Sequence, residues 1–191
     1  MEICFATHNE NKIREVRILL HPIKIVGLTE LGQHEEIPET GQTLDENSLL
    51  KAQFLFSKFQ VNCFADDTGL EVESLNGAPG VYSARYAGDK KDNQANIDLL
   101  LQNLEGIENR NARFRTVISL ILNGETFTFE GVVNGRITKD ISGSEGFGYD
   151  PIFMPEGYDI TFAEMSLEEK NSISHRGKAI KKLVDYLRST N

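Results

Sequence analysis

Two adjacent aspartates in the first half of the chain combine the residue types and the setting of a metal site. Asp66 and Asp67 follow a short apolar run, residues 63–65, and precede Thr68 and Gly69. We expect a strand that ends at the acidic pair and a turn directly after it. Adjacent strand residues point to opposite sides, so only one aspartate readily faces any given site, and we choose Asp67 because it lies nearer the turn. An exposed acidic turn that caps the strand is the alternative.

Two further carboxylates, Glu39 and Glu46, lie upstream of this pair. Mg²⁺ prefers oxygen ligands, keeps several waters and typically joins one or two carboxylates to phosphate oxygens. Glu39 stands in a Pro-Glu-Thr-Gly segment and Glu46 lies at the start of a predicted helix, so both belong to the acidic set beside Asp67. Asp66 stays open as a second ligand or as a hydrogen-bonding support.

Residues 7–12 carry groups that suit a phosphate chain. The segment lies where an apolar strand pattern gives way to a helical one, and it contains Thr7, His8, Asn9, Glu10, Asn11 and Lys12. Hydroxyl, amide and ammonium groups would act there together with the free backbone N–H groups of a helix start. A plain N-cap by Asn9 with an exposed lysine is the alternative.

A glycine-rich loop later in the chain carries two aromatic rings. Residues 143–151 include Phe147, Gly148, Tyr149 and Asp150. Glycines let a backbone approach a ligand closely, aromatic rings offer a stacking surface for a base, and a carboxylate accepts hydrogen bonds. A merely solvated loop has no need of large rings, so we favour a binding loop over a flexible surface loop.

Basic residues precede and begin the last predicted helix. Lys170 is followed by Ser174, His175 and Arg176, and Ser174 is the expected N-cap. Basic groups at a helix N-terminus oppose the helix dipole, which favours acids there. This placement is explained if an anion or a polar base binds between them. An exposed basic turn is the alternative.

The spacing of apolar residues predicts an α/β fold in a single domain that spans residues 1–191. Strand patterns cover residues 3–6, 24–28, 63–65, 70–73, 114–122 and 126–133, and helical patterns cover residues 9–20, 93–104 and 174–187. Another helix begins at Thr43 with a capping box to Glu46, and its residues Leu50, Phe54 and Phe59 are expected to face the core. Asn123-Gly124 predicts a tight hairpin. This order favours a mixed sheet with helices packed on it.

The composition argues against several classes of protein. The chain has 20 Lys and Arg against 29 Asp and Glu, and this formal net charge of −9 argues against a long nucleic-acid groove. No apolar stretch approaches the roughly 18 residues that span a bilayer, and no signal-peptide pattern begins the sequence, so we expect a cytoplasmic protein. Cys4 and Cys63 lie in apolar runs and are expected to be reduced core residues.

Several motifs of other hydrolases are absent from the sequence. It contains no Gly-x-x-x-x-Gly-Lys-Ser/Thr, no Gly-x-Ser-x-Gly and no His-Glu-x-x-His. The histidines at positions 8, 21, 34 and 175 do not pair at zinc-ligand spacing. A P-loop nucleotide site and a zinc-protease site are therefore not expected.

Taken together, these segments resemble the inosine triphosphate pyrophosphatase family, also described as Ham1-like or RdgB-like nucleoside triphosphate pyrophosphatases. The matching motifs occur in the family's order over nearly the whole chain, and their joint occurrence in register is highly specific. They are Thr7, Asn9 and Lys12; Glu39-Thr40-Gly41; Glu46, Asn47, Lys51 and Ala52; residues 65–70; residues 77–86; residues 146–151; and Ser174-His175-Arg176.

The resemblance implies a fold and a reaction. The fold would be an elongated α/β structure, with a central mixed sheet flanked by helices and two lobes around a substrate cleft, usually as a homodimer. The reaction would be the Mg²⁺-dependent hydrolysis of deaminated purine nucleoside triphosphates, ITP, dITP, XTP and dXTP, to the monophosphate and pyrophosphate. Such an enzyme cleanses the nucleotide pool, and neither a nucleic acid nor a membrane is implied as a partner.

The resemblance also assigns roles to residues. Glu39 and Asp67 would hold the metal, and Asp67 would be the catalytic base that acts on the attacking water. Residues 7–12, Lys51 and Thr68 would bind the triphosphate. The base pocket would be lined by Phe147, Gly148, Tyr149, Asp150, Lys170, His175 and Arg176.

One position departs from the family's pattern, because His8 stands where many relatives have glycine. If that position needs a positive φ, histidine adds strain there. Two other interpretations of the sequence stay open. An aspartate-nucleophile phosphatase could use residues 66–68 and release orthophosphate, and a nucleotide sensor would bind the triphosphate without hydrolysing it.

Overall fold

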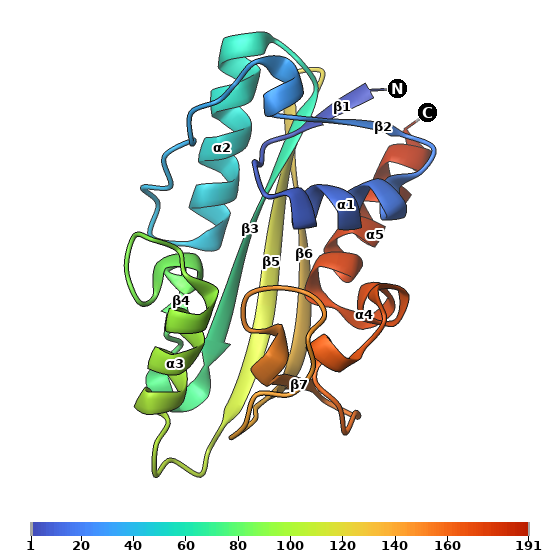
Figure 1. Cartoon of the computed structure of the whole chain (residues 1–191). Helices are drawn as coiled ribbons and strands as arrows, with labels where there is room; N and C mark the ends of the chain where they lie inside the picture. The colour runs from blue at the N-terminus through green and yellow to red at the C-terminus, as the bar shows by residue number, and fades with distance from the viewer. Residues whose placement is uncertain (1, 191) are drawn as a thin grey trace. The chain divides into compact units, whose positions relative to one another are not determined.

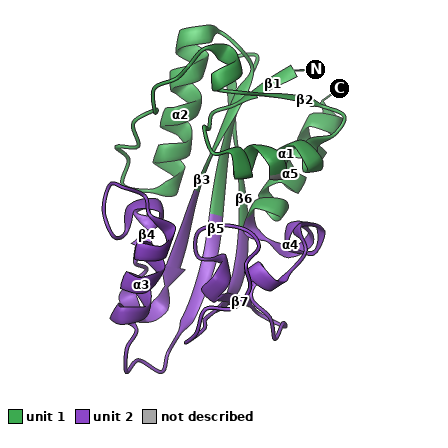
Figure 2. Ribbon diagram, in the orientation of Figure 1, with its two compact units in different colours: residues 1–67, 116–131, 176–191 green, residues 68–115, 132–175 purple. Residues whose placement is uncertain are grey.

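The computed structural model describes residues 2–190, and within them the chain divides into two compact units (Figures 1 and 2). Unit 1 contains residues 2–67, 116–131 and 176–190, and unit 2 contains residues 68–115 and 132–175. The chain passes between the units four times, within three strands and at the start of one helix, so no linker separates them. This explains why the composition shows no boundary. The single domain expected for residues 1–191 stays a prediction.

Unit 1 is built on a sheet in which the strand order is β2-β1-β3-β5-β6. Strands β1 (Glu2–Phe5) and β2 (Lys24–Gly27) are parallel, and β1 also pairs in parallel with the first part of β3 (Cys63–Val72). Strands β5 (Asn111–Leu122) and β6 (Glu125–Ile137) form the predicted hairpin. Its turn residues, Asn123 and Gly124, have φ of 53° and 85°, as a tight hairpin turn requires.

Helices cover both faces of this sheet (Figure 1). Helices α1 (Glu10–Leu20) and α5 (His175–Ser189) pack on one face, where their apolar side chains form a core with Phe5 and Phe64. Helix α2 (Leu44–Phe59) covers the other face, and its Ala52 and Leu55 pack against Cys63 and Ala65. Two cores therefore lie on opposite sides of the same strands.

Unit 2 has a core of its own around the other parts of β3, β5 and β6. Strand β4 (Pro79–Gly80) pairs antiparallel with β3, and β7 (Phe153–Pro155) pairs antiparallel with β6. Helix α3 (Asn93–Asn103) contributes Ile97 and Leu100 to this core, and α4 (Leu167–Ile173) precedes α5. Five short 3-10 helices complete the elements, at Thr29–Leu31, Glu73–Leu75, Ser83–Arg85, Asp150–Ile152 and Phe162–Glu164.

The parallel and antiparallel pairings together confirm the predicted α/β fold with a mixed central sheet flanked by helices. The predicted capping box of Thr43 with Glu46 is present, and the Asn9 side chain, considered as a plain N-cap, accepts the N–H groups of Asn11 and Lys12. Ser174, the expected N-cap of the last helix, is described instead as the C-cap of α4. No helix among residues 2–190 is both long enough and apolar enough to cross a bilayer.

The strand that carries the acidic pair is longer than predicted. Strand β3 continues without a break from Cys63 to Val72, so the turn expected at Thr68 and Gly69 is wrong. Pairing accounts for the difference, because β5 lies beside β3 and Leu70 is opposite Gly80 of β4. The acidic pair therefore lies inside a strand and not at the end of one.

The inward face of α2 also differs from the prediction. Leu50 is 38% exposed, and Phe54 and Phe59 are only partly buried. The buried face is formed instead by Leu44, Asn47, Ser48, Lys51, Ala52 and Leu55. Apolar spacing misplaced this face because three of the six buried residues are polar. Strands β4 and β7 and helix α4 are elements that the apolar pattern did not predict.

The two thiols give a test of this packing. Cys4 and Cys63 are free and buried, and burial raises the pKa of Cys4 to about 12 and that of Cys63 to about 11. Because the thiolate is the reactive form, neither thiol should react with an aromatic disulfide reagent at pH 8 in the folded protein. Both should react after unfolding in guanidinium chloride. Rapid titration of either thiol without denaturant would contradict the packing of the sheet.

Candidate active site

The alternation of side chains along β3 decides where each aspartate points. Phe64 lies on the α1 and α5 side, where its ring stacks on Phe5 with centroids 4.5 Å apart. Cys63 and Ala65 lie on the α2 side. Successive strand residues alternate between faces, so Asp66 shares the side of Phe64 and Asp67 shares the side of Ala65. Both aspartates are buried, and each needs a cation from its own face of the sheet.

Asp66 binds two cations that come from the two helices on its side. Its Oδ1 accepts a hydrogen bond from Lys12 Nζ at 2.9 Å, and its Oδ2 accepts one from Arg176 Nε at 3.4 Å. Lys12 is in the first turn of α1 and Arg176 is in the first turn of α5. Burial alone would raise the pKa of Asp66, but Lys12 and Arg176 hold that pKa well below its usual range. Asp66 therefore stays ionised and orients both cations.

The cluster of Lys12, Asp66 and Arg176 favours an anion. Two cations face one carboxylate, so these three groups sum to a charge of +1 within a chain of formal net charge −9. Burial lowers the pKa of Lys12, and the attraction of Asp66 only partly offsets this. An additional negative charge nearby would stabilise the ammonium.

Asp67 faces a different lysine on the other side of the sheet. Lys51 Nζ, on α2, lies 2.5 Å from Glu39 Oε1 and 3.7 Å from Asp67 Oδ1. Burial raises the pKa of Asp67, and Lys51 opposes this shift while Glu39 adds to it. Burial would lower the pKa of Lys51, but Asp67 and Glu39 raise it overall. Two carboxylates from distant segments thus converge on one ammonium group.

The pair Glu39 and Asp67 fits the donor set of Mg²⁺. Both supply hard oxygen atoms, and their shared contact with Lys51 shows that the two carboxylates lie where a positive charge is stabilised. Among residues 2–190 no group of three or more His, Cys, Asp or Glu side chains has a metal-binding arrangement. Mg²⁺ typically needs only one or two carboxylates, because waters and substrate oxygens complete its shell.

The other two acidic residues considered as ligands have different contacts. Glu46 Oε2 accepts the N–H groups of Gln42 and Thr43, so this carboxylate closes the capping box of α2. Asp66 has one oxygen bonded to Lys12 and the other to Arg176. Glu46 thus holds the helix start and Asp66 holds the cations.

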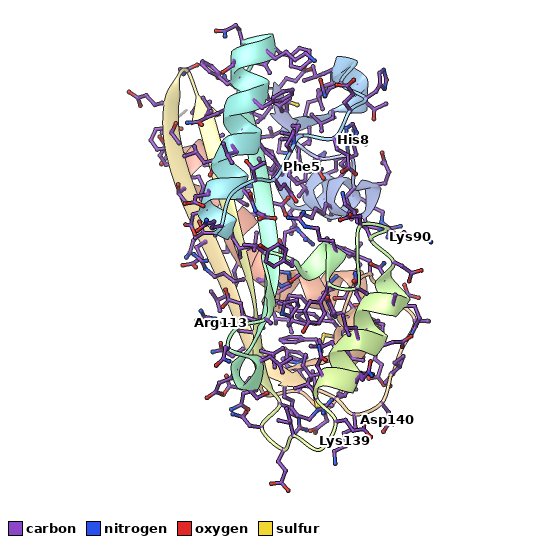
Figure 3. All side chains as sticks on the ribbon, turned by 90° about the vertical axis from the view of Figure 1, so that its left-hand side faces the viewer. Phe5, His8, Lys90, Arg113, Lys139 and Asp140 are labelled. Atoms are coloured by element: carbon purple, nitrogen blue, oxygen red, sulfur yellow. The ribbon has the colours of Figure 1, made fainter. Side chains whose placement is uncertain are left out.

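The loop between β1 and α1 supports Lys12. Thr7 Oγ1 accepts the N–H of Asn9, and Asn9 in turn caps the helix that carries Lys12. His8 lies on this loop after Phe5 (Figure 3), and its Nε2 is 3.2 Å from the carbonyl oxygen of Glu35. His8 does not have a positive φ, so the strain considered for histidine at this position does not arise. Glu10 and Asn11 are exposed on the first turn.

Unit 2 brings together Phe147, Asp150 and Lys170, three of the residues that the resemblance assigned to the base pocket. Asp150 Oδ2 accepts the N–H of Phe147 and a hydrogen bond from Lys170 Nζ, each at 2.8 Å. Lys170 Nζ also lies 4.8 Å from the centroid of the Phe147 ring. Gly146 has a φ of 78°, and a Cβ there would collide with the Asp150 carboxylate. The loop therefore requires glycine at this position.

Tyr149 and His175 are both buried in unit 2. The Tyr149 hydroxyl donates a hydrogen bond to the carbonyl oxygen of Ser83 at 2.8 Å, and the ring belongs to the core. The His175 ring stacks on Phe114, with centroids 4.6 Å apart. Tyr149 therefore anchors the loop of residues 143–151 to the core of unit 2, and Phe147 is a partly exposed ring of the same loop.

The remaining predicted residues are also placed by the structure. Thr68 follows Asp67 on β3 as a partly exposed residue of unit 2, and Gly148 has a φ of 62° within the binding loop. The sequence grouped Arg176 with His175, but Arg176 belongs to unit 1 and contacts Asp66. The structure thus places Arg176 in the cluster of Lys12, Asp66 and Arg176 in unit 1.

Sequence reasoning gave no role to Asn47, although it lies in one of the family motifs. Asn47 is fully buried on α2, one helical turn before Lys51. A polar residue four positions before a lysine, within a helix that packs on a sheet, is the signal that could have revealed it.

Unit 2 also has a cavity of about 960 Å³ that contains none of the predicted site residues. Two of its charged lining residues, Arg113 and Glu71, pair with each other at 2.5 Å. The side chain of Asn111 likewise donates to Glu73.

The buried ion pairs of Asp66 should contribute to folding. We expect Asp66→Asn to lower the free energy of unfolding by about 3 kcal/mol, because removing one partner leaves buried cations without compensation. Urea unfolding followed by circular dichroism measures this loss. Glu2→Gln is the matched control, since Glu2 pairs with Lys24 at 2.6 Å but both side chains are more than half exposed. That variant should lose less than about 1 kcal/mol. Equal losses in the two variants would show that the Asp66 pairs are not stabilising.

The chain is similar to known proteins over its whole length. The sequence model of the Ham1 family matches residues 3–186. A protein of Flavobacterium psychrophilum named dITP/XTP pyrophosphatase is 52% identical over 190 residues, which cover 99% of this chain and 100% of that protein. A Bacillus subtilis protein of the same name is 48% identical, and the match covers 95% of this chain and 94% of that protein. The solved structure of the Staphylococcus aureus Ham1 protein superimposes with a TM-score of 0.91 at 41% identity, over 100% of both chains. The chain belongs to the Ham1 family.

Proposed function

We propose that this protein is a nucleoside triphosphate pyrophosphatase that hydrolyses deaminated purine nucleotides to the monophosphate and pyrophosphate. ITP, dITP, XTP and dXTP are the proposed substrates, in line with the name dITP/XTP pyrophosphatase that its relatives carry. The observation that carries this proposal is the placement of Asp67 and Glu39 around Lys51, on the opposite side of β3 from Lys12 and Arg176.

The charge balance of unit 1 supports a metal-bound triphosphate. Three cations, Lys12, Lys51 and Arg176, face three carboxylates, so the six groups sum to zero. A triphosphate carries about four negative charges, and this set alone would not attract it. We propose that Glu39 and Asp67 hold a Mg²⁺ ion, which would give the site a net charge of +2. When bound, the ion would neutralise phosphate oxygens and act as a Lewis acid at the reacting phosphorus.

Asp67 is the proposed general base. Burial raises its pKa, which makes it a stronger base than an ordinary carboxylate and suits a group that takes a proton from water. The water oxygen forms a bond to the α-phosphorus while the bond between that phosphorus and the α,β-bridging oxygen breaks. The proton goes to Asp67, and pyrophosphate leaves with the electron pair of the broken bond. Lys12 and Arg176, held by Asp66, would stabilise the charge on the leaving group.

Unit 2 is proposed to bind the base of the nucleotide. Phe147 would stack on the purine ring, and Asp150 with Lys170 would fix the loop that presents it. Selection for a 6-keto purine follows if a donor meets the O6 atom, because the adenine amino group would leave that donor unpaired. Burying an unpaired donor is costly, so ATP would be rejected. The residues of unit 2 proposed to take part are Phe147, Gly148, Tyr149, Asp150, Lys170 and His175.

The assembly and the location of the protein are further parts of the proposal. The resemblance to its family supports a homodimer that acts in the cytoplasm on the nucleotide pool. Light scattering after size-exclusion chromatography would give the mass of the particle and thereby test the dimer.

The reaction can be tested directly. The purified protein is incubated with ITP, XTP, ATP or GTP and Mg²⁺, and both products are identified. We expect a nucleoside monophosphate and pyrophosphate from ITP and XTP. Asp67→Asn should lower the rate at least about 100-fold, since it removes the general base. Asp185→Asn removes an exposed carboxylate of α5 and should leave the rate unchanged. Release of orthophosphate would favour the aspartate-nucleophile phosphatase, and binding without turnover would favour a sensor.

The stacking role of Phe147 gives a separate prediction. Phe147→Ala should raise the KM for ITP about 10-fold or more, because base stacking on an aromatic ring contributes roughly 1–3 kcal/mol. Steady-state kinetics at saturating Mg²⁺ measures this change. Tyr158→Ala is the control, since Tyr158 is an exposed aromatic residue of unit 2 that lines the separate cavity. Equal effects of the two substitutions, or equal wild-type rates on ITP and ATP, would contradict the proposed base site.

A further inference from the structure

Asn47 connects two parts of the site of unit 1. It lies in the first turns of α2 with no exposed surface, and its Oδ1 accepts the N–H of Gly41 at 2.8 Å. Gly41 is two residues after Glu39, so this hydrogen bond ties the segment that carries a proposed metal ligand to the helix that carries Lys51.

The contact between Asn47 and Gly41 depends on glycine. A Cβ at Gly41 would lie 2.6 Å from the Cβ of Glu46 and 2.8 Å from Asn47 Oδ1. The Cβ of Glu46 is attached directly to the helix backbone and cannot move away, and Asn47 Oδ1 is held by its hydrogen bond to the Gly41 N–H. The Glu39–Gly41 segment is therefore held against α2 in a single close arrangement.

The other polar atom of Asn47 faces Asp67. Asn47 and Lys51 are four residues apart and lie on one face of α2, the face that meets Asp67. Among the residues that the structure describes, Asn47 Nδ2 is buried and makes no hydrogen bond of standard geometry. On this same face Lys51 Nζ lies 3.7 Å from Asp67 Oδ1. A buried donor without a strong partner is unfavourable unless it serves a bound state.

We propose that Asn47 is a positioning residue that holds Glu39 and Asp67 in the arrangement in which both bind one divalent cation. Its Oδ1 fixes the segment of Glu39, and its Nδ2 orients the Asp67 carboxylate. Groups that orient metal ligands in this way typically change metal affinity 10- to 100-fold when they are removed. This inference rests on the proposed function, because it assumes the Mg²⁺ site of Glu39 and Asp67.

Asn96 offers a matched control within the same chain. It is the fourth residue of α3, as Asn47 is the fourth residue of α2, and it is also buried. Its Oδ1 accepts the N–H of Ala87 at 2.7 Å, and its Nδ2 donates to the carbonyl oxygen of Ala84 at 3.1 Å. Both polar atoms of Asn96 thus bond to backbone, which is a purely structural role.

The experiment compares Asn47→Ala, Asn47→Leu and Asn96→Ala with the wild type. Leucine has the same branching and the same number of non-hydrogen side-chain atoms as asparagine but no polar atoms, so Asn47→Leu separates loss of the amide from loss of packing. Binding of Mn²⁺ to the nucleotide-free protein is measured from the electron paramagnetic resonance signal of the free ion. The Mg²⁺ concentration that gives half-maximal ITP hydrolysis is measured in parallel, and thermal unfolding reports stability.

We expect both Asn47 variants to bind Mn²⁺ about 10-fold more weakly and to need about 10-fold more Mg²⁺. Asn96→Ala should lower the melting temperature but leave both metal measurements unchanged. Wild-type metal affinity in a folded Asn47→Leu protein would overturn the proposal. So would failure of both Asn47 variants to fold, or a wild-type protein that binds no Mn²⁺. A wild type that binds Mn²⁺ but releases no pyrophosphate would refute the proposed function alone. The Mn²⁺ affinities of the variants would still test whether Asn47 positions the metal ligands.

Discussion

The site of unit 1 depends on one constraint, the burial of two adjacent carboxylates on a single strand. A buried charge must be paired, and strand geometry sends Asp66 and Asp67 to opposite faces of the sheet, so each face must provide its own cation. The helices that cover the two faces do this, with Lys12 and Arg176 on one side and Lys51 on the other. The three helices of unit 1 therefore serve both the core and the chemistry.

Much of this arrangement could be predicted from the sequence because it follows from local rules. The capping of α1 by Asn9, the capping box of α2 and the hairpin at Asn123 and Gly124 depend on residues that are close in the chain. The opposite orientation of the two aspartates follows from strand periodicity alone. The order of motifs indicated the family correctly, because many short matches occur in register.

The errors have a common cause, which is that hydrophobic periodicity assumes that buried residues are apolar. The buried face of α2 carries Asn47, Ser48 and Lys51, so the apolar pattern pointed to Leu50 instead. Strand β3 was divided at Asp66 and Asp67 because two charged residues resemble a turn, although their burial is compensated by cations from distant segments. The contact between Asp66 and Arg176 spans 110 residues, and no local pattern contains it. Such departures are expected where a fold accommodates a functional site.

The same long-range contact affects the order in which the protein can be completed during translation. Asp66 can pair with Lys12 early, because Lys12 is synthesised 54 residues before it. It can pair with Arg176 only after the last helix leaves the ribosome. Until then the apolar side chains of α1 and β1 also lack the cover that α5 gives them. A nascent chain, or a product truncated before α5, would therefore expose apolar surface and an incompletely neutralised carboxylate. Exposed apolar surface favours aggregation and is a feature that chaperones recognise.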